Sequence, residues 1–261
     1  MKPKIIIFDL ETMPNLKEAL KVWPQLSQYP GKTLRASITS IICAGWKYHN
    51  EKKTHCINAW DFKNWKTNVN DDMEVCKAIR EVLEDADAVV THNGTRFDWK
   101  YLQTRLLING LKPLPKIPHI DTCTIASRNL YFFNNRLDTL GEFLAGDRKM
   151  KHEGWDLWVK AWHKDAQALK KMEKYCKQDV KLLEKCFTAV KPLVSNLPNH
   201  NQWKNEAQRL ERVEICPTCG SNSLNSNGWR RTKTQIYKRF VCMNCGSWCR
   251  GDGHDKNVRA I

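Results

Sequence analysis

Apolar runs and polar turns alternate along the first part of the chain in a way that predicts β-strands. The apolar run within residues 4–10 reaches Asp9 and is typical of a central strand buried on both faces of a sheet. The β-rich segments 37–49 and 52–60 flank a short polar turn and predict a hairpin. We also predict a short buried strand at 86–93 and a further candidate at 119–122.

Helical periods separate these strands and then follow them. A period of apolar positions begins near residue 70, and a second helix is predicted over 97–110, where Gly110 ends it. Further helices are predicted over 136–146 and from about 164 to 191. Strands that come first and then alternate with helices predict an α/β fold, a mixed sheet flanked by helices.

The chain is long enough, at 261 residues, for one large domain and one small domain. We expect a domain over residues 1–192, a linker with a short polar helix over 193–214, and a small module over 215–261. No apolar run approaches the ~20 residues that span a membrane. Asp9 and Glu11 interrupt the N-terminal apolar run, so we expect no signal peptide and a cytoplasmic protein.

The net charge of +15 is strongly basic and is spread over both parts of the chain. Residues 201–261 hold eleven Lys and Arg against five Asp and Glu, which gives +6 and leaves +9 for residues 1–200. Phosphate backbones are the commonest partner of such a surface, and their binding depends on salt. A membrane surface is not favoured, because the sequence has no basic amphipathic helix with a clean apolar face.

Four acidic residues and a tyrosine recur in a particular order. Asp9 and Glu11 are two apart on the first strand, so both side chains point to one face of the sheet. Asp98 follows the sequence THNGTRF, and Tyr175 and Asp179 are four apart on one face of the last long helix. Each feature alone has an ordinary explanation: a strand end, an acid at a helix N-terminus, a tyrosine packed on the core.

Taken together, the order DxE, HN-x3-FD and Y-x3-D resembles the DEDD superfamily of 3′–5′ exonucleases, which have a ribonuclease-H-like fold, and within it the tyrosine-type (DEDDy) branch. The resemblance covers residues 1–190 and extends to FDLET, THNGTRFDWKYL and RLDTLGEFLAG. It implies that two Mg²⁺ or Mn²⁺ ions, about 3.5–4 Å apart in such sites, are held by four carboxylates, with a tyrosine that positions the attacking water: Asp9, Glu11, Asp98, Asp179 and Tyr175.

The resemblance further implies that Asn93 contacts the substrate strand and that Phe97 stacks near its terminal base, with core packing as the alternative for Phe97. Lys149 precedes a tryptophan-rich stretch, GWDLWVKAW. Basic side chains beside aromatic ones suit single-stranded nucleic acid. Helical spacing of these tryptophans nevertheless favours packing on the sheet.

The eleven cysteines are unevenly distributed. Six are single and indicate buried or half-buried free thiols, which favours a reducing compartment. Two CxxC pairs separated by 22 residues are the ligand pattern of a zinc ribbon with one structural Zn²⁺. Gly220 and Gly246 follow the pairs and suit the tight turn of each knuckle. Cys249 is surplus. The predicted ligands are Cys216, Cys219, Cys242 and Cys245.

The segment between the two knuckles is basic and interleaved with aromatic residues. It bears a looser resemblance to zinc ribbons of transposase-associated and other nucleic-acid proteins. Binding to a protein, or only covering the larger domain, are the alternatives. The predicted phosphate contacts are Arg230, Arg231, Lys233, Lys238 and Arg239.

These observations predict a metal-dependent 3′–5′ exonuclease that acts on DNA with a single-stranded 3′ end, with a zinc ribbon that assists binding. An RNA exonuclease and a structure-specific endonuclease with the same site are alternatives. A non-catalytic nucleic-acid-binding protein is the alternative of another class. A proofreading role would need a separate polymerase or other replication or repair protein as partner, and the compact layout is compatible with a phage origin.

Overall fold

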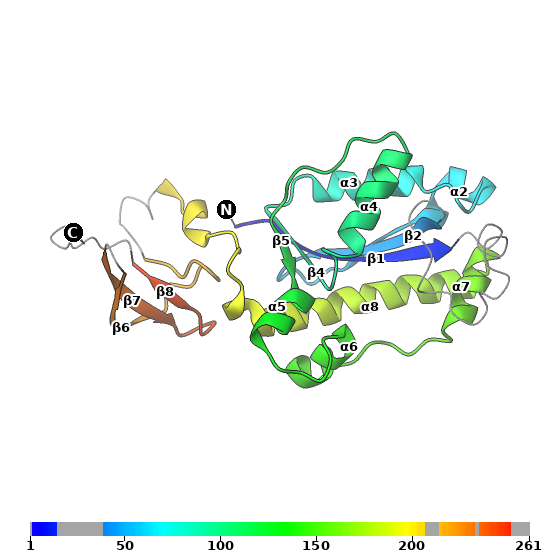
Figure 1. Ribbon diagram of the computed structural model, residues 1–261. Helices are drawn as coiled ribbons and strands as arrows, with labels where there is room; N and C mark the ends of the chain where they lie inside the picture. Colours follow the sequence, from blue (N-terminus) through cyan, green and yellow to red (C-terminus); the bar gives the residue numbers. More distant parts are fainter. Residues whose placement is uncertain (1, 15–38, 207–213, 233–234, 252–261) are drawn as a thin grey trace. The chain divides into compact units, whose positions relative to one another are not determined.

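The computed structural model describes residues 2–14, 39–206, 214–232 and 235–251 (Figure 1). The chain divides into two compact units. The larger comprises Lys4–Thr188, and the smaller comprises Ala189–Ile261 with Met1–Pro3. Within the described ranges, no helix is both long enough and apolar enough to cross a membrane.

The larger unit is built on a five-stranded mixed sheet with the strand order β3-β2-β1-β4-β5. β1 pairs antiparallel with β2 and parallel with β4, while β2–β3 is antiparallel and β4–β5 is parallel. This arrangement confirms the predicted fold class. The strands are β1 Ile5–Pro14, β2 Thr39–Tyr48, β3 His55–Asn58, β4 Ala88–Thr91 and β5 His119–Asp121.

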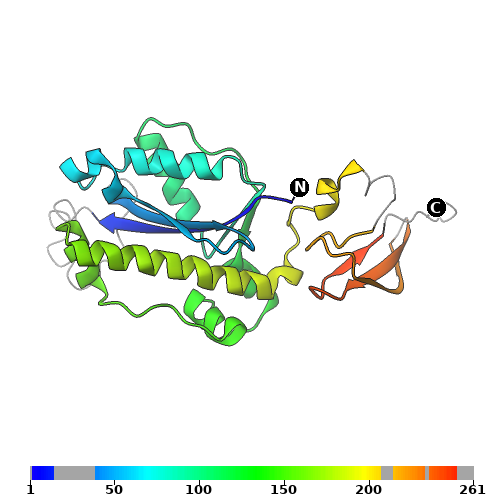
Figure 2. The same ribbon diagram turned by 180° about the vertical axis from the view of Figure 1, so that it is seen from behind.

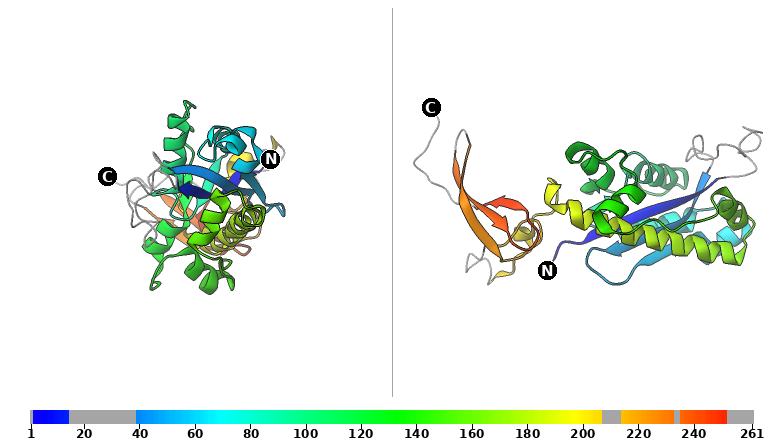
Figure 3. Two further views of the ribbon diagram at one scale, coloured as in Figure 1. Left: turned by 90° about the vertical axis from the view of Figure 1, so that its right-hand side faces the viewer. Right: turned by 90° about the horizontal axis from the view of Figure 1, so that it is seen from below.

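Helices cover both faces of this sheet. α3 (Met73–Leu83) and α4 (Asp98–Ile108) lie on one face, and the long α8 (Ala166–Val190) runs along the other (Figures 1 and 3). Seen from behind, α8 follows β1 along its length (Figure 2). The remaining elements of this unit are η1 Ala59–Asp61, α2 Lys63–Thr67, α5 Thr122–Asn129, α6 Leu137–Leu140, a π turn Gly141–Ala145 and α7 Trp155–Trp162.

The smaller unit contains a three-stranded antiparallel sheet in the order β6-β7-β8. Its strands are β6 Leu224–Arg231, β7 Ile236–Cys242 and β8 Trp248–Arg250, preceded by the 3₁₀ turns η3 Lys191–Leu193 and η4 His200–Trp203. The backbone N–H of His200 donates to the carbonyl of Pro217 over 3.0 Å, so the turn η4 packs on the first knuckle. The short polar helix predicted to follow falls largely on 207–213, outside the described residues.

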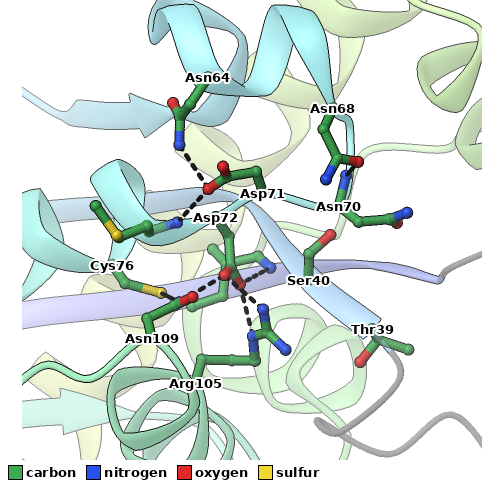
Figure 4. A network of polar contacts seen from close by, with 12 residues as sticks. Thr39, Ser40, Asn64, Asn68, Asn70, Asp71, Asp72, Cys76, Arg105 and Asn109 are labelled. Carbon is green, nitrogen blue, oxygen red and sulfur yellow. Dashed lines mark hydrogen bonds and ion pairs between the residues drawn. The ribbon is translucent and has the colours of Figure 1, made fainter.

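A buried ion pair joins strand β2 to helices α3 and α4, which lie on one face of the sheet (Figure 4). Asp72, immediately before α3, is fully buried and accepts hydrogen bonds from Arg105 Nε and Nη2 at 2.8 and 2.6 Å. The backbone N–H of Ile41 in β2 and the side-chain amide of Asn109 also donate to this carboxylate, over 2.8 and 2.7 Å. Because all these donors converge on one buried carboxylate, the network fixes α3, α4 and β2 against each other.

A second ionic contact ties α8 to β2. Glu184 on α8 forms an ion pair with Lys47, and it accepts a hydrogen bond from the backbone N–H of Asn50 at 2.8 Å. Burial raises the pKa of Glu184, but hydrogen bonds with His49, Lys47 and Asn50 outweigh burial and lower that pKa to about 2. Because the folded-state pKa lies below the ordinary value of 4.5, this contribution to stability is present above about pH 4.5 and is lost as the pH falls toward 2.

We therefore expect Glu184→Gln to lower the free energy of unfolding at pH 7 by about 1.5–3 kcal/mol, the range of hydrogen bonds to charged groups. The difference from the wild type should shrink as the pH falls from 4.5 toward 2. Urea denaturation followed by circular dichroism at several pH values measures both effects. The exposed Glu51→Gln is the matched control and should change little. A pH-independent difference would contradict the assignment.

Candidate functional site

The end of β1 places two carboxylates on the face of the sheet that α8 covers. Asp9 pairs with Gly45 of β2 across the strands, and Glu11 pairs with Cys43. Residues two apart on a strand point to the same face. The neighbouring residues Phe8 and Leu10 point the other way, into the apolar core. The strand alternation recognised in the sequence therefore places both acids beneath α8.

α8 supplies the third carboxylate of this group. Asp179 is only 1% exposed, and one carboxylate oxygen from each of Asp9, Glu11 and Asp179 lies within 4.8 Å of the others. Tyr175 is buried one helical turn earlier on the same face. The fold thus brings together residues that are about 170 positions apart in the chain.

Asp98 lies beside this group, as the first residue of α4. It is buried, which raises its pKa to about 7, although backbone hydrogen bonds from its own N–H and from Leu10 oppose that rise. Its charge in turn raises the pKa of Asp9 and of Glu11. Asp98 therefore interacts electrostatically with Asp9 and Glu11, while the tightest cluster consists of the three carboxylates on β1 and α8.

The repulsion among the carboxylates of this cluster favours the binding of a cation. Burial, followed by the charges of Asp179 and Glu11, raises the pKa of Asp9 well above its usual value. Burial and the charge of Asp179 raise the pKa of Glu11 to about 8. In addition, Asp9 Oδ2 is buried without a hydrogen-bond partner. Mutually repelling oxygen donors with an unsatisfied buried atom fit a hard divalent cation such as Mg²⁺ or Mn²⁺.

Lys149 reaches into the same cluster, which the sequence reasoning did not foresee. Its Nζ lies 2.6 Å from Asp179 Oδ2 and 5.1 Å from the centre of the Tyr175 ring. Its charge lowers the pKa of Asp9 and of Glu11, opposing the carboxylates. Burial lowers the pKa of Lys149. The negative charges of Asp179 and its neighbours raise this pKa by more than burial lowers it, so the ammonium stays charged.

The tryptophan-rich stretch packs behind the tyrosine. Trp158 of α7 donates a hydrogen bond from its Nε1 to the carbonyl of Thr12 over 3.0 Å. The Tyr175 ring makes edge contacts with His152 and Trp158, with centroids 4.8 and 6.4 Å apart. For Trp158, these contacts confirm the packing interpretation, since the indole links the end of β1 to the tyrosine on α8.

The turn that carries the second motif is held by an aspartate that the sequence reasoning passed over. Asp121, at the end of β5, accepts hydrogen bonds from the backbone N–H groups of Asn93 and Thr95 over 2.9 and 3.1 Å. The same carboxylate caps α5, where Cys123 N donates to it over 3.0 Å. Burial raises the pKa of Asp121, but hydrogen bonds from the Thr95 hydroxyl and from the backbone N–H groups of Thr95, Asn93 and Thr124 outweigh burial and lower it. The sequence signal that could have identified Asp121 is a polar residue at the end of a predicted strand.

Asn93 and Phe97 differ in how they are held. Asn93 has a left-handed backbone, with φ of 63°, which asparagine tolerates better than most residues. The Phe97 side chain is 42% exposed and touches Tyr101, with ring centroids 5.5 Å apart. Phe97 is therefore only partly packed, and part of its side chain is exposed.

Three of the single cysteines meet on the same face of the sheet. Cys43 of β2, Cys56 of β3 and Cys176 of α8 have sulfur atoms within 4.8 Å of one another. Hydrogen bonds with Cys176 and Cys43 lower the pKa of Cys56 to about 5, whereas burial raises the pKa of Cys43. The sequence indicated buried thiols but gave no sign that these three converge.

The two CxxC pairs of the smaller unit also converge. The distances from Cys216 Sγ to Cys245 Sγ and from Cys219 Sγ to Cys242 Sγ are both 3.7 Å. Four sulfurs about 2.3 Å from one zinc ion lie about 3.8 Å from each other. The donor set and its spacing therefore fit a tetrahedral Zn²⁺. Lys191 lies near enough for Cys216, Cys219 and Cys245 to raise its pKa, although burial lowers that pKa more.

Both knuckles share one backbone design. Gly220 and Gly246 have φ of 75° and 73°, the left-handed conformation that glycine adopts without strain. Their N–H groups donate to the carbonyls of Cys216 and Cys242 over 2.8 and 2.9 Å. The turn predicted after each CxxC pair is therefore confirmed.

The β-sheet of the smaller unit sorts the predicted basic residues onto two faces. Arg230 pairs with Tyr237, and Arg239 pairs with Arg250, so these side chains share a face. On it the Arg239 guanidinium lies 4.7 Å from the Trp248 ring centre, and that of Arg250 lies 4.4 Å from the Tyr237 ring. Sequence reasoning missed Trp248 and Arg250, because only the strand register places them there.

The other predicted basic residues lie elsewhere. Lys238 pairs with Trp229 on the opposite face, where its Nζ is 5.4 Å from the Phe240 ring. Arg231 pairs with Ile236, which places it on that face too. Lys233 lies outside the described residues.

Comparison with known proteins identifies the larger unit. Residues 36–190 match a family model described as the RNase_H superfamily. The chain belongs to this superfamily. The matched stretch includes Asp98, Tyr175 and Asp179 and begins after β1, so it does not include Asp9 and Glu11.

One relative gives a closer comparison. The DNA polymerase III PolC-type of Ureaplasma parvum serovar 3 (strain ATCC 700970) is 31% identical to this chain over 141 residues. The alignment covers 52% of this chain and 9% of the relative, so the chain corresponds to a small part of that polymerase. The mixed sheet order and this relative support a DnaQ-like, ribonuclease-H-like fold for the larger unit.

Proposed function

We propose that this protein is a metal-dependent 3′–5′ exonuclease of the tyrosine-type DEDD branch that acts on DNA. The observation that carries the proposal is the group formed by half-buried Asp9 and Glu11 with buried Asp179. One carboxylate oxygen from each lies within 4.8 Å of the others, with Tyr175 one helical turn away. Membership of the RNase_H superfamily supports nuclease chemistry for such a group. The polymerase relative favours DNA as the substrate.

The four carboxylates would hold two Mg²⁺ or Mn²⁺ ions, which would activate the attacking water and stabilise the negative charge on the leaving 3′-oxygen of the shortened strand. The protein's own residues do the rest. Tyr175 orients the attacking water, since burial and Asp179 raise its pKa and make it a poor base at neutral pH. Phe97, whose side chain is 42% exposed, stacks on the terminal base, and Asn93 contacts the strand.

The smaller unit would assist binding as a zinc ribbon. The face that carries Arg230, Arg239 and Arg250 alternates guanidinium groups with the rings of Tyr237 and Trp248. Trp248 is 56% exposed, so its ring is available to a base while the guanidinium groups meet phosphates. This combination favours nucleic acid over the alternatives of a protein partner or a purely structural cover.

We expect the variant Arg239→Ala with Arg250→Ala to weaken binding to single-stranded DNA and to lower the slope of log K against log salt by about 1–2. Filter binding at several salt concentrations measures this change. Lys238→Ala, on the opposite face, is the matched control. An equal loss in the control would show that charge alone, and not this face, binds the strand.

The deciding experiment is digestion of 5′-labelled single-stranded DNA and of matched RNA with Mg²⁺, with Mn²⁺ and with EDTA. A metal-dependent ladder that shrinks from the 3′ end of DNA supports the proposal. A ladder from RNA alone would assign an RNA exonuclease, and internal cuts would assign an endonuclease. Binding without cleavage of either strand would overturn the catalytic proposal.

Lys149 gives the cluster a testable electrostatic property. The Lys149 ammonium forms an ion pair with one carboxylate oxygen of Asp179. Its positive charge would repel a divalent cation bound nearby. We expect Lys149→Met to lower the melting temperature without metal and to raise the affinity for Mg²⁺ about tenfold, which corresponds to ~1.4 kcal/mol. Melting temperature as a function of Mg²⁺ concentration measures both, with the exposed Lys151→Met as control. Unchanged Mg²⁺ dependence would show that Lys149 does not compete with the ion.

A further inference from the structure

The three thiols of Cys43, Cys56 and Cys176 form a cluster that shares no residue with the CxxC pairs or with the carboxylate group, although Cys43 pairs with Glu11 across β2 and β1. Their sulfur atoms all lie within 4.8 Å of one another, and they come from β2, β3 and α8. Three sulfurs about 2.3 Å from a shared ion lie about 4 Å apart, so a small inward movement would let all three reach one ion.

Gly45 makes room for the cluster. It follows Cys43 by two residues on the same face of β2, and it pairs with Cys56 across β2 and β3. A Cβ atom at Gly45 would lie 3.0 Å from Cys176 Sγ and 2.7 Å from Val180 Cγ2. The missing side chain therefore lets the thiol of α8 approach the sheet where the other two thiols lie.

The arrangement favours a shared ion over a disulfide. Cys43 pairs with Asn58, and Cys56 pairs with Gly45, so the two cysteines are diagonal neighbours with Cα atoms about 7–8 Å apart. A disulfide needs Cα atoms closer than about 7 Å. A disulfide between Cys176 and either of the other two cysteines would leave the third thiol unpaired. An ion at the centre uses all three sulfurs at once.

The surroundings suit a soft cation with three ligands. Cys43 and Cys176 are fully buried, whereas Cys56 is half-buried and gives a route from solvent. Lys177, paired with Glu173, lies near Cys56 and Cys176 and would offset part of the thiolate charge. Among the residues that the structure describes, the group includes no fourth ligand side chain. Three thiolates without a hard donor select soft ions of the Cu(I) class.

We propose that Cys43, Cys56 and Cys176 form a three-thiolate binding site for a soft monovalent cation of the Cu(I) type, at the junction of α8 with β2 and β3. This site can be tested without the exonuclease activity, because the test measures only metal binding. It couples to that region through Cys176, which follows Tyr175 directly on α8. A bound ion would tie α8 to the sheet beside the carboxylate cluster.

The test uses the full-length, zinc-loaded protein under anaerobic conditions, titrated with Cu(I) against a chromophoric Cu(I) chelator. We expect one equivalent of Cu(I) to bind without release of zinc, and Cys56→Ser to weaken that binding at least tenfold. Cys123→Ser, which removes another half-buried thiol outside the cluster, is the matched control and should bind like the wild type. Cys43→Ser serves as a second variant if Cys56→Ser folds poorly.

Peptide-resolved alkylation locates the ion. Bound Cu(I) is expected to slow modification of Cys56 by N-ethylmaleimide at least tenfold and to leave Cys123 unchanged. Uptake of Cu(I) that is equal in wild type and Cys56→Ser, or that releases one zinc per copper, would assign the copper to the CxxC pairs and overturn the proposal. Unprotected Cys56 in the presence of one bound equivalent would overturn it too.

Discussion

Asp9→Asn is expected to lower the rate of DNA hydrolysis by about 10³-fold or more, while the metal-free protein keeps or gains stability. Asn has the same size but lacks the charge that a divalent cation requires, and removal of one preorganised electrostatic group in an active site costs about 10²–10³-fold. The stability should not fall, because partial burial and the neighbouring like charges raise the pKa of Asp9 and disfavour its charged form. Single-turnover hydrolysis of 5′-labelled DNA measures the rate.

Thermal melting with and without Mg²⁺ separates this result from misfolding. An ion that binds only the folded state raises the melting temperature, so wild type should gain stability from Mg²⁺ and Asp9→Asn should gain little. Asp85→Asn, whose side chain is 79% exposed, is the control and should keep both activity and Mg²⁺ response. Hydrolysis at the wild-type rate by Asp9→Asn would remove this cluster from the mechanism.

Asp72→Ala is expected to lower the free energy of unfolding by about 3–5 kcal/mol, since it leaves the Arg105 guanidinium buried without its charged partner. The same change removes the acceptor for the N–H of Ile41 and for Asn109. A domain of this kind has about 5–15 kcal/mol in total, so the loss is a large fraction. Urea denaturation followed by circular dichroism gives the value.

Two comparisons interpret this loss. Glu84→Ala breaks the ion pair with Arg80 on the surface of α3, at 2.7 Å, and should cost less than about 1 kcal/mol. The double variant Asp72→Ala with Arg105→Met should lose less than the sum of its single variants, because the unpaired charge is gone. A loss below about 1 kcal/mol for Asp72→Ala would show that the network does not stabilise the junction of α3, α4 and β2.

The sequence was sufficient for features that depend on local chemistry. The alternation along β1 gave the shared face of Asp9 and Glu11, and the helical period of α8 gave the shared face of Tyr175 and Asp179. Similarly, the turn glycines and the spacing within each CxxC pair depend only on residues that are neighbours in the chain. These patterns, with the order of the motifs, predicted a mixed α/β sheet with a second metal-binding module.

Only the tertiary structure decided which distant side chains share one place. Lys149 reaches Asp179 from a segment with no helix or strand of its own, so no period in the sequence indicates its target. Cys43, Cys56 and Cys176 converge through the register of β2 against β3 and the rotation of α8 above Gly45. Register and rotation are set by packing of the whole core, because a shift of one residue would turn each side chain to the other face.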